Sequence, residues 1–194
     1  EGVLMWASML EKKNNGDWDI DFEIVAPGNT FSQRPDVIMN VVWYDDDYGA
    51  CGEIRGYAQL GPGFTKSGAP INTVVCASVF GMGTSNAEVS NIAAHEFVHA
   101  IGLGHAFNKP GDLMCSMEPS RTSNSKIPVP TCGWMVEISE VSRFLTMIRP
   151  SDMDIATVEH MYKQDGFKTP NQHVPLCLDL RICDPPRFTV EDYQ

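Results

Sequence analysis

Three of the five histidines lie within the eleven-residue window 95–105, at a spacing that suits one metal ion. His95 and His99 are four residues apart, so on a helix both imidazoles project from the same face. Glu96 lies one step round from that face, where its carboxylate is placed to take a proton from a metal-bound water rather than to bind the metal. Gly102 allows the chain to leave the helix sharply, so that His105 can return to the same ion. Three neutral imidazoles and one open position are typical of a catalytic zinc.

The competing interpretation is a helix that carries three unrelated histidines, each solvated or satisfied by neighbours. Chance agreement of three His, one Glu and one Gly with this spacing is on the order of one in a million, which favours the metal site. His160 and His173 lie outside the pattern. For His160, within the last expected helix, we expect an ordinary surface or packing role.

The helix that carries the histidines has a start signal and a stop signal. Ser85 precedes Glu88 by three residues, which is the capping-box pattern of a helix N-terminus. Gly102 ends the helix, because glycine adopts a positive φ without steric cost. Between them runs an apolar stripe suited to packing on a sheet, formed by Val89, Ala93, Phe97, Ala100 and Ile101.

The sequence before this helix predicts one helix and four strands. Apolar residues at helical spacing over Val3–Lys13 predict the helix. Alternating apolar and acidic residues over Trp18–Val25 predict a half-buried strand, and the nearly continuous apolar run Val37–Trp43 predicts an inner strand covered on both faces. Further strands are expected at Gly56–Leu60 and Ile71–Val79. Together with the later helices, this order indicates a mixed sheet of the α/β kind.

The C-terminal part predicts one more helix and a tail. The helix is expected to begin after Ser151, its N-cap, with Asp154 at the third position, and to end at Gly166. Residues 167–194 are rich in Pro and contain Cys177 and Cys183, so we expect a stapled tail after a single domain of residues 1–166.

Charge and hydropathy exclude two classes of partner. The chain has 25 acidic and 14 basic residues and a formal net charge of -11, which argues against a nucleic-acid binder. No apolar run approaches the roughly 20 residues of a membrane-spanning helix, so the chain is expected not to span a membrane. The oligomeric state is left open.

Six cysteines, an even number without a CxxC pair, indicate disulfides and an oxidising compartment. We therefore expect a secreted or cell-surface protein. Six cysteines allow 15 pairings. Proximity in sequence favours Cys177 with Cys183 and Cys115 with Cys132, which leaves Cys51 with Cys76.

The segment HEFVHAIGLGH, residues 95–105, has the form HExxHxxGxxH and resembles the metzincin zinc endopeptidases. That family places a methionine in a tight turn beneath the metal, and Asp112-Leu113-Met114 follows the third histidine at a suitable distance. The resemblance implies that Met114 is this Met-turn residue, with Met117 as the second candidate. The alternative is that either methionine only fills the core.

Within the metzincins the sequence is most similar to the matrixins. The run Ile92–Phe97 resembles their active-site helix, and Ser151–Ile155 resembles the start of their last helix. Residues Gly56, Tyr57, Ala58, Gln59 and Leu60 lie where that family has its substrate-pairing edge strand. The likeness covers most of residues 1–166, with the best agreement over Ser90–Met114.

Two departures from the matrixin pattern affect the expected ligands. No histidine precedes His95, so the second, structural zinc of that family is expected to be absent. Ser116 stands two residues after Met114, so the tyrosine ligand of astacin-like relatives is not expected.

The resemblance implies an α+β, metzincin-like catalytic domain: a mixed, mostly parallel twisted sheet, an active-site helix, a Met-turn and a C-terminal helix, with an upper lobe to about residue 105 and a lower lobe after it. It implies a zinc-dependent endopeptidase, a hydrolase that cuts extracellular polypeptides through a zinc-bound water activated by Glu96. Two alternatives stay open: a catalytically silent zinc-containing component of a surface assembly, and an exported hydrolase of non-peptide amides.

A calcium ion is a further cofactor candidate. Asp45, Asp46 and Asp47 precede Tyr48-Gly49, and oxygen ligands on a turn suit Ca²⁺. The alternative is a solvated turn between two strands.

Overall fold

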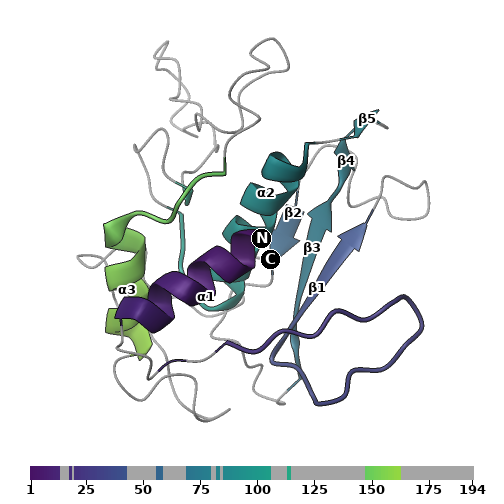
Figure 1. Cartoon of the computed structure of the whole chain (residues 1–194), viewed down its shortest axis with the longest axis horizontal. Coiled ribbons are helices and arrows are strands. Elements are labelled where there is room, and N and C mark those ends of the chain that lie inside the picture. Colours follow the sequence, from purple (N-terminus) through teal and green to yellow (C-terminus); the bar gives the residue numbers. More distant parts are fainter. Residues whose placement is uncertain are drawn as a thin grey trace, which may run out of the picture.

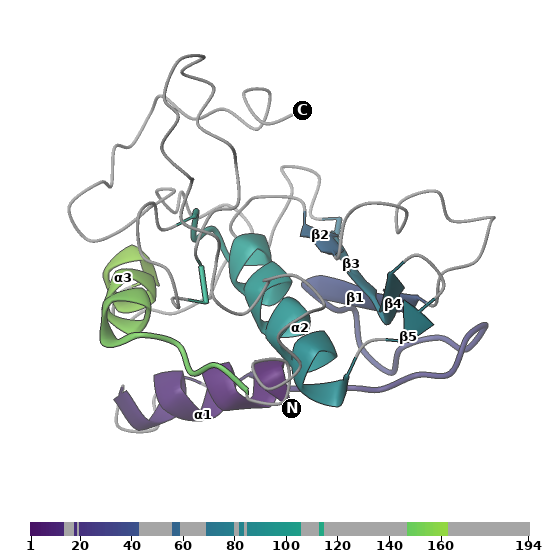
Figure 2. The ribbon, with the colours of Figure 1, turned by 90° about the horizontal axis from the view of Figure 1, so that it is seen from above.

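The buried helix α2, Asn86–Ala100, separates a β-sheet from two further helices in the computed structural model. Figure 2 shows the sheet on one side of α2 and helices α1, Gly2–Lys13, and α3, Asp152–Tyr162, on the other. The structure describes residues 1–13, 18, 20–42, 56–58, 69–79, 82–83, 85–105, 113–114 and 147–162. Over these residues the protein is of the α+β class, with a small mixed sheet and three helices.

The main sheet has the strand order β1-β3-β2 (Figure 1). Strand β1, Val37–Val42, runs parallel to β3, Ile71–Cys76, with Val37 opposite Ile71. Strand β2, Gly56–Ala58, pairs antiparallel with the other edge of β3. A separate two-stranded ladder follows, in which β4, Ser78–Val79, pairs with β5, Met82–Gly83.

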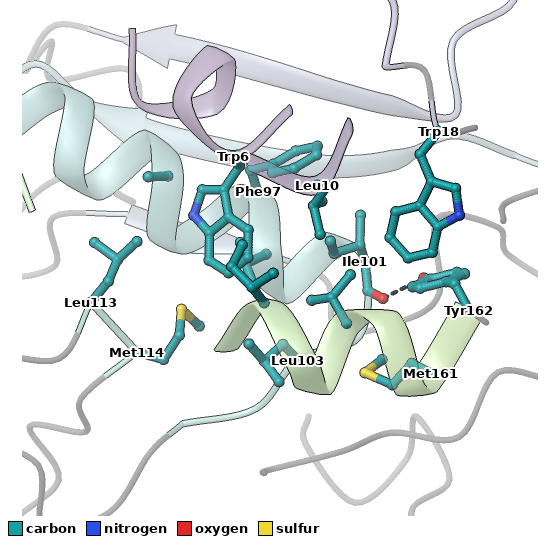
Figure 3. Close-up of a cluster of buried hydrophobic side chains, with 14 of the residues drawn as sticks. Trp6, Leu10, Trp18, Phe97, Ile101, Leu103, Leu113, Met114, Met161 and Tyr162 are labelled. Carbon is teal, nitrogen blue, oxygen red and sulfur yellow. Dashed lines mark hydrogen bonds between the residues drawn. The ribbon is translucent and has the colours of Figure 1, made fainter. Parts of the chain in front are cut away.

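One hydrophobic cluster joins all three helices and the sheet (Figure 3). Trp6 and Leu10 of α1 are four residues apart, so both enter this core from the same face of the helix. The hydroxyl of Tyr162 in α3 donates a hydrogen bond to the carbonyl of Ile101, which ties α3 to the end of α2. The remaining fully buried members come mainly from α2, α3 and the segments that follow α2: Ile92, Ala94, Val98, Leu103, Leu113, Met114 and Val158.

The expected helix boundaries are confirmed within one residue where the structure describes them. Ser85 caps α2 and accepts a hydrogen bond from the amide of Glu88 at 3.2 Å. At α3, Ser151 and Asp154 exchange bonds: the Asp154 amide donates to the serine hydroxyl at 3.2 Å, and the Ser151 amide donates to the aspartate carboxylate at 2.9 Å. This reciprocal pair is a capping box. The expected extension of α3 to Gly166 lies outside the described residues.

The strand predicted over Trp18–Val25 is wrong, because the described residues of that range are irregular and Ile24 is 99% exposed. Instead, the carboxylate of Glu23 accepts bonds from the amide and hydroxyl of Ser32 at 2.9 and 2.8 Å. Alternation assigns side chains to two faces but supplies no partner strand. The bond from Glu23 holds the backbone amide of Ser32, and no described strand pairs with residues 18–25.

Two further predictions about the sheet need correction. Val37–Trp43 was expected to be the inner strand, but β1 is only half buried and lies at one edge of the described sheet, and Trp43 lies outside the described residues. The inner strand is β3. The expected strand Ile71–Val79 is divided at Ala77, whose amide donates to the Val42 carbonyl at 2.8 Å before β4 begins.

Cys76, fully buried at the end of β3, is disulfide-bonded. The other five cysteines lie outside the described residues, so the pairing of Cys76 with Cys51 stays a prediction. Among the described helices, none has the length and apolar character needed to cross a bilayer.

Replacing Leu10 by Ala tests whether α1 holds the core together. The side chain is fully buried, and the truncation should lower the free energy of unfolding by about 2–5 kcal/mol. Leu4 of the same helix is 56% exposed, so Leu4→Ala is the matched control and should change stability by under about 0.5 kcal/mol. Urea unfolding of both variants gives the comparison, and equal losses would contradict the described packing of α1.

Candidate metal centre

The site begins on helix α2, which is buried along most of its length. His95 and His99 are 4% and 6% exposed, and they project from one face of the helix as their spacing predicts. Their ring centroids are 4.5 Å apart in an edge-to-face arrangement. Two polar rings are thus removed from water together, which a protein tolerates only when their nitrogens find partners.

A glycine turn brings the third imidazole to the first two. Gly102 has φ 104°, and its amide donates to the His99 carbonyl at 2.9 Å. The Leu103 amide donates to the Val98 carbonyl at 3.0 Å. These two bonds form a Schellman motif, the expected helix stop. The motif reverses the chain so that His105, although past the helix, reaches the rings on α2.

The three imidazoles converge through the same ring nitrogen. The Nε2 atom of His99 lies 2.9 Å from that of His95 and 3.0 Å from that of His105, and the His95 and His105 Nε2 atoms are 3.2 Å apart. Within the described part of the chain, this is the one group of histidine, cysteine or acidic side chains close enough to share a metal ion.

Backbone carbonyls determine which nitrogen of two rings carries the proton. His95 Nδ1 lies 2.7 Å from the carbonyl of Leu113, and His99 Nδ1 lies 2.7 Å from the carbonyl of Leu103. A carbonyl only accepts, so each Nδ1 must donate, and the neutral ring then has its lone pair on Nε2. The Nε2 lone pairs of His95 and His99, 2.9 Å apart, are therefore directed toward the same point, and a cation there would resolve their repulsion. Metal-ligating histidines commonly have their other ring nitrogen held by a carbonyl in this way.

The electrostatics of the site keep the rings in the form that binds metal. Burial, followed by the charge of His105, lowers the pKa of His95 to about 4 against the opposing bond to Leu113. Burial, followed by His95 and His105, lowers the pKa of His99 well below its usual value. Both rings are consequently neutral near pH 7, and neutral imidazole is the metal ligand.

The spacing of the three nitrogens fits zinc. A tetrahedral ion bonded to nitrogen at about 2.0–2.1 Å holds its ligand atoms roughly 3.3 Å apart. The Nε2 separations of 2.9–3.2 Å are slightly smaller than this ligand spacing, so an ion would fit after a small outward shift of the rings. Imidazole suits several transition metals, and the geometry alone does not distinguish them.

Glu96 is buried beside the histidines but is not one of the clustered donors. Burial raises the pKa of its carboxyl to about 8. A cation held by the imidazoles would favour the ionised form and oppose that shift. Glu96 thus lies outside the group of candidate ligands, and its role in proton transfer stays a prediction.

Met114 follows directly after the carbonyl that binds His95. Leu113 and Met114 form a turn, and both are fully buried in the core (Figure 3). The turn therefore supports the metal centre through the Leu113 backbone. The second candidate, Met117, lies outside the described residues.

The strand expected at Gly56–Leu60 is found in part. Gly56, Tyr57 and Ala58 form β2, an edge strand of the described sheet that lies next to α2, while Gln59 and Leu60 lie outside the described residues. The calcium candidates Asp45, Asp46 and Asp47 also lie outside them.

Sequence reasoning missed the groups that orient the site. The carbonyls of Leu103 and Leu113 carry no signal in residue type, because every residue has a carbonyl. Sequence reasoning also missed the close approach of Gly56 to the Glu96 side chain, although a glycine within a strand often marks a close backbone approach.

No protein-family model matches this chain, and comparisons with curated proteins and with solved structures give no match.

Replacing His99 by Ala should abolish tight metal binding, because two imidazoles and a water bind far more weakly than three converging imidazoles. The purified native protein should contain about one zinc per chain by elemental analysis. His160→Ala is the matched control, since His160 is exposed on α3 and outside the cluster, and it should keep the full metal content. Equal metal content in both variants would show that the three histidines are not the binding site.

Proposed function

We propose that this protein is a zinc-dependent endopeptidase with a metzincin-like catalytic domain, most similar to the matrixins. The observation that carries the proposal is the convergence of three Nε2 atoms within 3.2 Å, two of them on rings whose Nδ1 atoms are held by carbonyls. His95, His99 and His105 would hold the zinc. The ion would supply a Lewis acid that lowers the pKa of a water molecule and polarises the scissile carbonyl.

Glu96 is proposed as the general base. Its carboxylate would take a proton from the attacking water and pass it to the leaving amine, while the peptide C–N bond breaks and a C–O bond forms. The position of Glu96 supports this role: it is buried, it adjoins His95 on α2, and it is not among the donors that converge on the ion.

Strand β2 is proposed to bind the polypeptide substrate. Its edge away from β3 pairs with no other described strand, and β2 lies beside the helix that carries Glu96. An extended peptide can add to such an edge through backbone hydrogen bonds, which accept many side chains. The buried disulfide at Cys76 supports secretion or surface display.

A digestion of casein or gelatin, with and without a chelator, tests the proposal against its alternatives. Chelator-sensitive cleavage is the expected result. A fully zinc-loaded protein that cleaves no protein substrate would instead indicate a silent zinc-containing component or a hydrolase of non-peptide amides.

Replacing Glu96 by Gln separates catalysis from metal binding. Zinc content and fold should be retained, and cleavage of a quenched peptide should fall by about 10²-fold or more, since glutamine cannot accept the proton. Glu11→Gln, at an exposed position of α1, is the matched control and should cleave normally. Near-normal cleavage by Glu96→Gln would remove the general-base role, and loss of zinc would make Glu96 a ligand.

A further inference from the structure

Strand β2 approaches helix α2 most closely at Gly56. A Cβ atom at this position would lie 2.9 Å from both Cγ and Oε1 of Glu96, and 2.8 Å from Cγ2 of Ile92. Separations under 3.0 Å are not tolerated by carbon atoms, so any side chain at position 56 would force a neighbour to move. The φ of Gly56 is outside the left-handed region, so the glycine is required by this contact and not by the backbone conformation.

A methyl group at position 56 would press on two side chains of α2, Ile92 and Glu96. Ile92 is 1% exposed and belongs to the main core cluster, so its close-packed methyl group has little room to move and its contact would push β2 outward. The Glu96 carboxylate is the end of a flexible side chain, whose terminal torsion is soft. Two of the three close atoms also belong to Glu96. A methyl group at position 56 would therefore push the Glu96 carboxylate out of its present place.

We propose that Gly56 is a positioning residue for Glu96: the missing side chain on β2 provides the space that holds the Glu96 carboxylate in its place between β2 and α2, one residue along the helix from His95. The kinetic consequence rests on the proposed peptidase function, but the contact itself does not. Strand β2 would thus have a second role besides substrate pairing.

Gly56→Ala should lower kcat for a quenched peptide by about 10- to 100-fold, the scale expected when a reacting group is misplaced by around 1 Å. KM and zinc content should change little, because the three imidazoles are not displaced. A loss of zinc parallel to the loss of activity, or a rise in KM with unchanged kcat, would overturn the positioning role.

Two other glycines provide matched controls for the same substitution. Gly28 has φ 84° and open space around its missing Cβ, so Gly28→Ala introduces backbone strain without a contact. Gly2→Ala places a Cβ 1.9 Å from the Ser90 carbonyl oxygen and forces α1 away from α2. Both should lower the melting temperature and leave kcat per zinc-loaded enzyme unchanged. A similar fall in kcat for either control would make the Gly56 effect a general loss of stability and overturn the proposal.

A double-mutant cycle tests whether Gly56 acts through Glu96. In the Glu96→Gln background, Gly56→Ala should reduce the residual kcat by less than about twofold, because the group that it displaces no longer transfers the proton. An undiminished fall in this background would overturn the proposal.

A second double-mutant cycle measures stability and requires no peptidase activity. Glu96→Ala removes two of the three close atoms, Cγ and Oε1, and leaves Ile92 Cγ2, so Gly56→Ala should still shift the urea midpoint in this background but less than in the native protein. If Gly56→Ala alone does not fold, the double variant should fold. Equal shifts in both backgrounds, or a double variant that stays unfolded, would overturn the positioning role. Coupling without any peptidase activity in the native protein would support the contact and contradict the proposed function.

Discussion

Three imidazole Nε2 atoms that meet at one point constrain the rest of this structure. The Nε2 atoms of His95, His99 and His105 lie within 3.2 Å of one another, while carbonyls bind Nδ1 of the first two rings at 2.7 Å. A neutral ring has one N–H, and the carbonyl takes it, so neither His95 nor His99 has a hydrogen left to bridge their two Nε2 atoms. The face of α2, the Schellman turn after it and the buried turn at Leu113 must all be in place before the three nitrogens can converge. The metal centre is therefore a product of tertiary packing, and metal binding should in turn stabilise that packing.

Helix α2 can hold polar groups in the core because it is enclosed from two sides. Strands β2 and β3 cover one side, and helix α1 packs against the other (Figure 2). At Gly56 the sheet comes so close that a methyl group would strike Glu96. The burial that results makes the imidazoles poor proton acceptors, which leaves them neutral as ligands, and it raises the pKa of the Glu96 carboxyl. The same enclosure thus leaves the imidazoles in the neutral form that binds a metal.

The parts of the site that depend on local spacing could be predicted from sequence, and the parts that depend on distant backbone could not. His95, Glu96 and His99 share a helix, and Gly102 has the positive φ that returns His105, so helical geometry and glycine conformation were sufficient. The Leu113 carbonyl is 18 residues from His95, and nothing in its residue type marks it. In the sheet, apolar runs located β1 and β3 but did not reveal that β3 is the inner strand. Alternation alone predicted a strand over Trp18–Val25, where the structure has an irregular segment whose Glu23 carboxylate accepts a bond from the Ser32 amide.

The X-ray absorption spectrum at the zinc K-edge of the protein loaded with one zinc tests the central claim most directly. The account predicts three imidazole nitrogens and one further light atom at about 2.0–2.1 Å, with the multiple-scattering pattern of histidine rings. His99→Ala should lose that pattern together with the metal. Sulfur ligands at about 2.3 Å, or a first shell with fewer than three imidazoles, would contradict the assignment of His95, His99 and His105 as the metal centre.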